Sequence, residues 1–196
     1  MTASPFRAVI FDMDGTLTRP FLDFPKIRAS IGVAEPLLEN MLALPPGPDR
    51  DRAFAILDRF EDEAAEASEL NDGTREVLAF LETRSIPSAV VTRNSRRSTL
   101  RVLSKHGLRF ELCVTRDDAP AKPRPEPLWL ICERLGVPPA EALMVGDFKF
   151  DILAGRNAGT RTALLTHGKT PSYLKEIPPD HLLERLEDLL RLFQAT

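Results

Sequence analysis

The sequence predicts an α/β fold in which a Rossmann-like parallel sheet of five to six strands is flanked by helices, with a small all-helical cap inserted after the first strand. Two observations predict it. From about residue 74 onward, short apolar runs rich in β-branched residues alternate with segments of helical length, a pattern typical of parallel sheets with right-handed crossovers. A block of helical periodicity, at about residues 23–70, interrupts this alternation directly after the first strand.

Each predicted strand is a short, continuous apolar run, which is typical of strands that are buried on both faces. These runs lie at residues 8–11, 88–92, 112–115, 142–146 and 162–165, and a short edge strand is expected at 180–183. Core helices are expected at residues 74–84, 94–106, 125–135 and 151–158, before a final amphipathic helix at 185–193. Gly107, Gly136 and Gly159 directly follow three of these helices, at the position where a left-handed backbone often ends a helix.

The chain is expected to form two units, a core of residues 1–18 and 71–196 and a helical cap of residues 19–70. Prolines at residues 45–48 break the cap into a shorter and a longer helix. The longer helix carries apolar residues on one face, which is typical of a packed amphipathic helix. Its acidic side, at residues 61–66, is expected to be a solvated face.

Composition and charge exclude several classes of protein. Of the 196 residues, 43% are hydrophobic and 28% charged, as in ordinary globular proteins. The net charge is −3 with scattered basic residues, so no nucleic acid polymer is expected as a partner. No apolar run reaches the roughly 20 residues that a membrane span needs, and the N-terminus does not resemble a signal peptide. Cys113 and Cys132 lie in apolar stretches without metal-ligand spacing, which predicts reduced thiols in a cytoplasmic protein. Nothing in the sequence indicates an oligomeric state.

Polar side chains follow the predicted strands at the edge where parallel sheets bind ligands. Asp12 and Asp14 come directly after the first strand, and a Gly-Thr turn follows them. Thr92 ends the second strand, just before a helix N-terminus whose free N–H groups favour anions. Two adjacent carboxylates repel each other, so a cation, a lysine or a shared proton must offset their charge.

The third and fourth strands supply the remaining charged residues of this edge. Lys122 lies in a loop stiffened by four prolines, and Asp147 and Asp151 follow the fourth strand. With Asp12 and Asp14, four carboxylates then face one ammonium, so a divalent cation reduces the formal charge from −3 to −1. Oxygen ligands without His or Cys favour Mg²⁺ over Zn²⁺. The sequence therefore predicts a Mg²⁺ site that holds a phosphate with help from Lys122 and Thr92.

In this order, the residues resemble the four motifs of the haloacid dehalogenase superfamily. The motifs are Asp12-x-Asp14-Gly15-Thr16, Thr92, Lys122-Pro123 and Gly146-Asp147-x-x-x-Asp151. The insert after the first motif is similar to the small helical cap of the phosphoglycolate-phosphatase-like branch. The resemblance extends over the core from about residue 8 to residue 165.

The resemblance implies a phosphatase that uses a covalent aspartyl-phosphate. Asp12 would be the nucleophile, and Asp14 would act as general acid and base, with neighbouring negative charges favouring its protonated form. Thr92, the amide of Arg93 and Lys122 would bind the phosphoryl oxygens. The Mg²⁺ ligands would be Asp12, the backbone carbonyl of Asp14, Asp147 and Asp151, the last either directly or in support.

Resemblance to this branch implies a small phosphorylated metabolite as the substrate, phosphoglycolate-like by default. One alternative is a phosphomutase of the β-phosphoglucomutase type, which would use the same catalytic residues. A second alternative is a non-catalytic phosphate-binding protein on the same fold. Phe148 departs from the small residue that commonly follows the aspartate of the fourth motif, and it is expected either to narrow the pocket or to pack under the cap.

Overall fold

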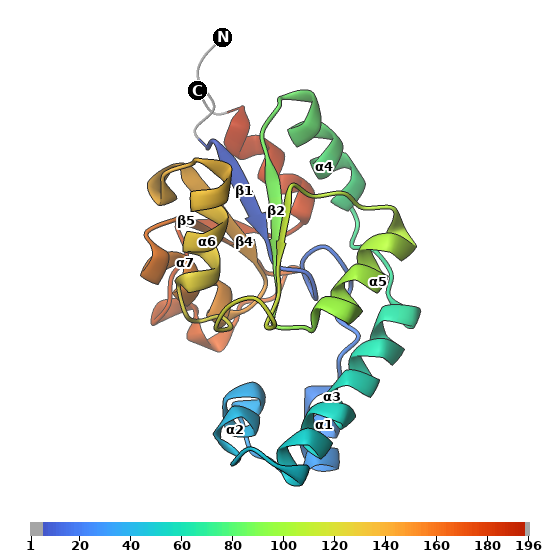
Figure 1. Cartoon of the computed structure of the whole chain (residues 1–196). Helices are drawn as coiled ribbons and strands as arrows, with labels where there is room; N and C mark the ends of the chain where they lie inside the picture. The colour runs from blue at the N-terminus through green and yellow to red at the C-terminus, as the bar shows by residue number, and fades with distance from the viewer. Residues whose placement is uncertain (1–5, 195–196) are drawn as a thin grey trace.

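The computed structural model describes residues 6–194, in which helices cover both faces of a sheet and a further group of helices, α1 to α3, extends beyond the carboxyl ends of the strands (Figure 1). Within these residues the sheet has six strands, all parallel, in the order β3-β2-β1-β4-β5-β6. The strands are β1 (Ala8–Phe11), β2 (Ser88–Val91), β3 (Leu112–Val114), β4 (Ala142–Gly146), β5 (Arg161–Leu165) and β6 (His181–Leu183). The predicted fold class, including the edge strand, is confirmed.

The helices also follow the expected order. Those nearest the carboxyl edge are α1 (Phe24–Ile31), α2 (Leu37–Ala43) and α3 (Pro48–Ala67). The sheet is covered by α4 (Thr74–Thr83), α5 (Arg96–His106), α6 (Glu126–Leu135) and α7 (Lys149–Ala158), together with three 3₁₀ helices, η1 (Pro139–Glu141), η2 (Ser172–Lys175) and η3 (Leu186–Phe193). None of the helices in residues 6–194 has the length and apolarity to cross a membrane.

Several helices differ from the sequence prediction. Helix α5 begins at Arg96, two residues late, with Ser95 as its N-cap. The cap region contains three helices where a shorter and a longer one were expected. Helix α7 begins at Lys149, two residues early, because the Asp151 carboxylate accepts the Phe148 N–H at 3.0 Å and closes the first turn. The last helix, η3, is a 3₁₀ helix. Its buried residues Leu186 and Leu189 are three positions apart, a spacing that matches the three residues per turn of this helix type.

Alternation along β1 divides the core into two layers. Val9 and Phe11 pack on one face of the sheet, in a cluster that includes residues from α4, α5 and η3. Ala8 and Ile10 pack on the other, in a cluster that includes residues from α6 and α7. Successive strand residues point to opposite faces, so a strand buried on both sides must be apolar throughout. The four residues of β1 are accordingly all buried.

A third apolar cluster, which includes Ile27, Met41 and Leu57, joins helices α1, α2 and α3. Helix α3 does not stop at this cluster. Its last turns reach α5 (Figure 1), and Ala65 belongs to the same core cluster as the sheet. One continuous helix therefore links the region predicted as the cap to the core, while the predicted domain boundaries themselves stay a prediction.

The prediction of a solvated acidic side on α3 is wrong for Glu61 and Asp62. Glu61 is 2% exposed. Its carboxylate accepts both the N–H and the hydroxyl of Ser95 and forms an ion pair with Arg116. Asp62 forms ion pairs with two arginines of α5. The partners of Asp62 lie in α5, whereas Glu61 is paired by Ser95, which precedes α5, and by Arg116, which follows β3. Helical periodicity alone does not show such partners.

Candidate active site

The sheet order brings the predicted strand-end residues together. Strand β1 lies between β2 and β4, and Ile10 pairs with Ala89 on one side and Met144 on the other. From β1 the chain adds β2 and β3 on one side, and it then crosses to β4 on the other side of β1. Such a switch in strand order opens a crevice at the carboxyl ends of the strands, and Asp12, at the end of β1, lies in it.

A cavity of about 340 Å³ lies at this edge, between the strand ends and helices α1 and α2. All the residues predicted for the site line it: Asp12, Asp14, Thr92, Arg93, Lys122, Asp147 and Asp151. Side chains from the cap region complete the wall, among them Phe24, Arg28 and Leu37. Residues from four separate loops and from helices α1, α2 and α7 thus face a common space large enough for a small metabolite.

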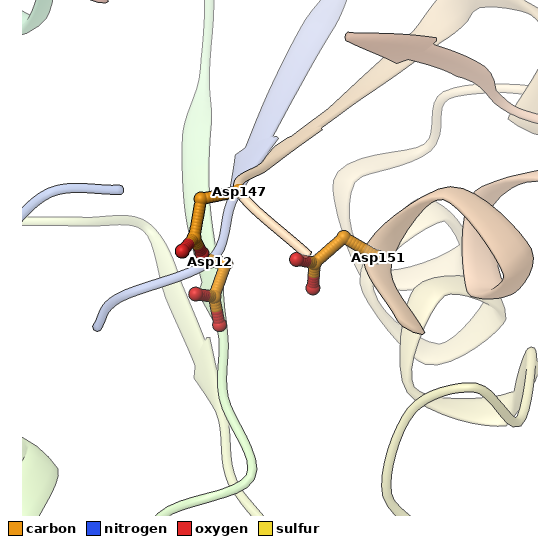
Figure 2. A group of neighbouring side chains, drawn as sticks. All are labelled: Asp12, Asp147 and Asp151. Carbon is orange, nitrogen blue, oxygen red and sulfur yellow. The ribbon is translucent and has the colours of Figure 1, made fainter. Parts of the chain in front are cut away.

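Three carboxylates form an acidic centre at the base of the cavity. Asp12, Asp147 and Asp151 each offer an oxygen atom within 4.8 Å of the others. Figure 2 shows the Asp151 side chain, from α7, extending toward the other two. Gly15 makes this packing possible: its φ is +86°, and a Cβ there would lie 2.2 Å from an Asp147 carboxylate oxygen. A side chain at position 15 would therefore displace Asp147.

Lys122 lies among these carboxylates and is 2% exposed. Its ammonium is 2.5 Å from Asp12 Oδ1 and 2.7 Å from Asp151 Oδ1, and it donates to the Val91 carbonyl at 2.9 Å. Burial alone would lower the pKa of Lys122, but attraction to Asp12 and Asp151 outweighs burial and raises it. The lysine is therefore charged and fixed by three acceptors.

One ammonium does not balance three carboxylates. Burial, followed by repulsion from Asp12 and Asp151, raises the pKa of Asp147 well above its ordinary value. Burial also raises the pKa of Asp12, to about 7, although attraction to Lys122 opposes that rise. A bound cation would therefore favour the ionised form that a nucleophile needs. A divalent cation among these oxygens would remove the excess negative charge. The donor set consists of carboxylates with no His or Cys, and it therefore suits Mg²⁺.

Asp14 is held apart from the acidic centre. Asn94 Nδ2 donates to its Oδ2 at 2.6 Å, and the Thr18 hydroxyl lies 3.5 Å from its Oδ1. Burial raises the pKa of Asp14 to about 6, against the hydrogen bond from Asn94. Neighbouring negative charges were expected from the sequence to favour the protonated form of Asp14. The pKa is raised, as expected, but the main cause is burial. Repulsion by Glu61 contributes less, and the carboxylates of the acidic centre are not among the leading causes.

Thr92 and Arg93 occupy the turn between β2 and α5. The Thr92 hydroxyl accepts the N–H of Asn94 at 3.2 Å. The Arg93 side chain is turned toward the cap and donates two 2.9 Å hydrogen bonds to the Glu39 carboxylate of α2. Its guanidinium also lies 4.8 Å from the Phe150 ring centre and donates to the Lys122 carbonyl. Its guanidinium thus connects α2 to the loop that carries Lys122.

Sequence reasoning missed two polar residues of this site. Asn94 orients Asp14 through a hydrogen bond. The only sequence signal for this role is weak: Asn94 is a polar residue two positions after Thr92. Glu39 has no such signal, because nothing local distinguishes it from other exposed helix acids and its partner Arg93 is 54 positions away. Phe148 lines the cavity and is 40% exposed.

Comparison with known proteins gives consistent similarities. A family model described as haloacid dehalogenase-like hydrolase matches residues 39–165. A haloacid dehalogenase-like hydrolase domain-containing protein of Arabidopsis thaliana is 30% identical over 96% of this chain and 84% of its own length. An N-acetylmuramic acid 6-phosphate phosphatase of Pseudomonas putida is 36% identical over 83% of each chain. The crystal structure of a hydrolase from Pseudomonas syringae has a TM-score of 0.80 at 21% identity and covers 96% of this chain and 98% of that one.

Proposed function

Because the chain belongs to the haloacid dehalogenase-like hydrolase family, we propose that it is a Mg²⁺-dependent phosphatase that hydrolyses a small phosphomonoester through an aspartyl-phosphate on Asp12. The family assignment confirms the resemblance drawn from the four motifs. One observation carries the proposal: Asp12, paired with Lys122, and Asp14, held by Asn94, line the same cavity in two different environments. Two carboxylates whose environments differ suit a nucleophile and a general acid.

Substrate binding places the phosphoryl group against positive and hydrogen-bonding groups. In the proposal, the Thr92 hydroxyl, the amide of Arg93 and the ammonium of Lys122 bind the phosphoryl oxygens. Lys122 already contacts one oxygen of Asp12, which leaves the other carboxylate oxygen free of that ion pair to approach phosphorus. Such fixed donors stabilise the charge that develops in the transition state.

In the first step, a carboxylate oxygen of Asp12 attacks phosphorus and the bond from phosphorus to the leaving oxygen breaks. Asp14 gives its proton to that oxygen, so the alcohol leaves in neutral form. A carboxyl group whose pKa is raised to about 6 holds a proton in a usable fraction of molecules near neutral pH. The hydrogen bond from Asn94 and the charge of Lys122 both favour the ionised form of Asp14, but burial outweighs them and keeps the pKa raised.

In the second step, Asp14 takes a proton from water and the water oxygen attacks phosphorus. The bond between phosphorus and Asp12 breaks, inorganic phosphate leaves and both carboxyl groups return to their starting states. When bound, Mg²⁺ would neutralise phosphate charge and orient the phosphoryl group. The proposed ligands are Asp12, the backbone carbonyl of Asp14 and Asp147. Asp151, whose two oxygens already contact Lys122 and the Phe148 N–H, would support the site.

The test is phosphate release from p-nitrophenyl phosphate and a panel of phosphomonoesters in the presence of Mg²⁺. The panel contains phosphoglycolate, the default of the branch, and N-acetylmuramic acid 6-phosphate, the substrate in the name of the Pseudomonas putida relative. We expect activity that is lost in Asp12→Asn and after chelation of divalent ions. An inactive wild type, or Asp12→Asn with full activity, would refute the proposal. Glucose 6-phosphate formed from β-glucose 1-phosphate would indicate the phosphomutase alternative.

A cytoplasmic location stays a prediction of the cysteine pattern.

A further inference from the structure

Beyond the acidic centre, much of the cavity wall is formed by apolar side chains, and the proposed chemistry gives these side chains no role. Leu22, Phe24 and Leu37 line it from the cap region, and Phe148 and Phe150 line it from the core. The phosphate binds at the polar end of the cavity, so the remainder of the substrate must occupy the apolar part. The character of this wall therefore bears on which leaving group fits.

Two aromatic side chains leave much of their surface uncovered at this wall. Phe24 is 47% exposed and Phe148 is 40% exposed. Both line the same cavity, one from α1 and the other from the turn before α7. Exposed apolar side chains that line one cavity indicate a surface that a ligand covers. Phe21 is similarly exposed, at 38%, but does not line the cavity.

The Phe148 ring is held in place without a ligand. It makes edge-to-face contacts with Phe150 and Tyr173, at ring-centre distances of 5.2 and 5.9 Å. The ammonium of Lys149 lies 5.6 Å from its ring centre. A ring fixed in this way loses little conformational freedom when a ligand packs on it, so its apolar contact contributes more fully to binding.

The charges of the outer cavity do not favour an anionic leaving group. Arg28 and Glu35 both line the cavity and carry opposite charges. Arg93 is neutralised by its two hydrogen bonds to Glu39. Among these four side chains the formal charges cancel. The Lys149 ammonium lies near the Phe148 and Phe150 rings, but Lys149 does not line the cavity. A carboxylate-bearing group such as glycolate would have to compete for Arg28 in the presence of Glu35, and it would leave the aromatic surfaces uncovered.

We propose that the leaving group of the natural substrate is an uncharged alcohol that carries an apolar ring, packed between Phe24 and Phe148. This inference rests on the proposed phosphatase function and specifies its substrate class. It replaces the phosphoglycolate-like default with a larger and less polar compound. Phe24 and Phe148 are then specificity-determining residues, and neither takes part in the transfer of the phosphoryl group.

Three phosphate esters of primary alcohols test the inference, because their leaving oxygens are chemically alike. Benzyl phosphate carries an apolar ring, phosphoglycolate carries a carboxylate, and ethyl phosphate carries neither. The value of kcat/KM is measured for each ester with the wild type and with Phe24→Ala, Phe148→Ala and the matched control Phe21→Ala. Circular dichroism confirms that each variant is folded.

We expect benzyl phosphate to have the highest kcat/KM. We also expect Phe24→Ala and Phe148→Ala each to lower its kcat/KM by about tenfold, since each removes roughly half a phenyl ring of apolar contact. Ethyl phosphate should be hydrolysed equally by all four proteins. The inference is overturned if phosphoglycolate is the best of the three esters, if either variant lowers the values for ethyl and benzyl phosphate alike, or if both leave benzyl phosphate unaffected. Hydrolysis of none of the three esters, nor of p-nitrophenyl phosphate, would instead overturn the phosphatase function, and this inference with it.

Discussion

Replacing Lys122 with methionine tests how strongly the acidic centre depends on its ammonium. Methionine keeps most of the length and apolar volume of the side chain but removes the charge. The change deletes the contacts to Asp12 at 2.5 Å, to Asp151 at 2.7 Å and to the Val91 carbonyl at 2.9 Å. It leaves the clustered carboxylates without the ammonium that lies among them.

The expected loss of stability follows from burial. Removing one partner from a buried ion pair costs about 3–5 kcal/mol, because the other charge stays buried and unpaired. The side chains of Lys122 and Asp151 are 2% and 3% exposed, so solvent offers little screening. With a total stability of roughly 5–15 kcal/mol for a typical domain, Lys122→Met should lower the urea midpoint markedly. Lys175→Met, at an exposed position, should change stability by less than about 0.5 kcal/mol.

Urea unfolding followed by circular dichroism, in the presence of a chelator, measures both variants without a cation that could replace the lysine. Asp151→Asn removes one of the carboxylates that Lys122 neutralises. The double variant Lys122→Met/Asp151→Asn should therefore lose less stability than the sum of the single variants, by about 1–3 kcal/mol. A Lys122→Met protein as stable as Lys175→Met, or strict additivity in the double variant, would refute the reasoning.

Three further predictions concern the rest of the site and the sheet. Asn94→Ala removes the 2.6 Å hydrogen bond to Asp14, so kcat should fall by about tenfold to hundredfold with little change in KM; an unchanged kcat in steady-state kinetics would contradict that orienting role. The Arg93–Glu39 ion pair is part-exposed. A double-mutant cycle with alanine should therefore give a coupling of about 0.2–1 kcal/mol in the free energy of unfolding. Zero coupling would show that this ion pair does not hold the cap to the core. Hydrogen bonds from strand β5 outweigh burial and hold the pKa of Asp180 below its ordinary value. The ionised carboxylate therefore stabilises the fold at pH values above that ordinary pKa. This contribution is lost as the pH falls through the lowered pKa. Asp180→Asn should therefore be less stable than the wild type at pH 7, with a difference that shrinks in acid, and a pH-independent difference in thermal unfolding would contradict this assignment.

Much of the fold follows from patterns that are local in sequence. A buried strand of a parallel sheet must be apolar on both faces, so each one appears as a continuous run such as Ala8–Phe11. The parallel direction of the strands could also be anticipated, because the alternation of strands and helices is typical of right-handed crossovers. The strand order could not, because the handedness of a crossover does not determine which strands are neighbours. Because the strands are parallel, Asp12 and Asp147 were expected at the same edge of the sheet, and the structure shows that their strands are neighbours.

Contacts between elements that are distant in sequence could not be predicted in this way. Glu61 was expected in solvent because its neighbours are acidic, but Ser95 and Arg116 supply donors that keep it buried. Glu39 meets Arg93 across the boundary between α2 and the core. In both cases the decisive partner comes from another part of the chain, and helical periodicity carries no information about it.

The central claim is that Asp12 forms a covalent phosphoryl intermediate, and trapping that species tests it most directly. Borohydride reduces an aspartyl-phosphate to homoserine, which peptide mass spectrometry locates in the chain. During turnover of a hydrolysed ester with Mg²⁺, the account predicts homoserine at position 12. It predicts none without substrate and none in Asp12→Asn. Rapid turnover with an unmodified Asp12, or homoserine at another aspartate, would contradict the account.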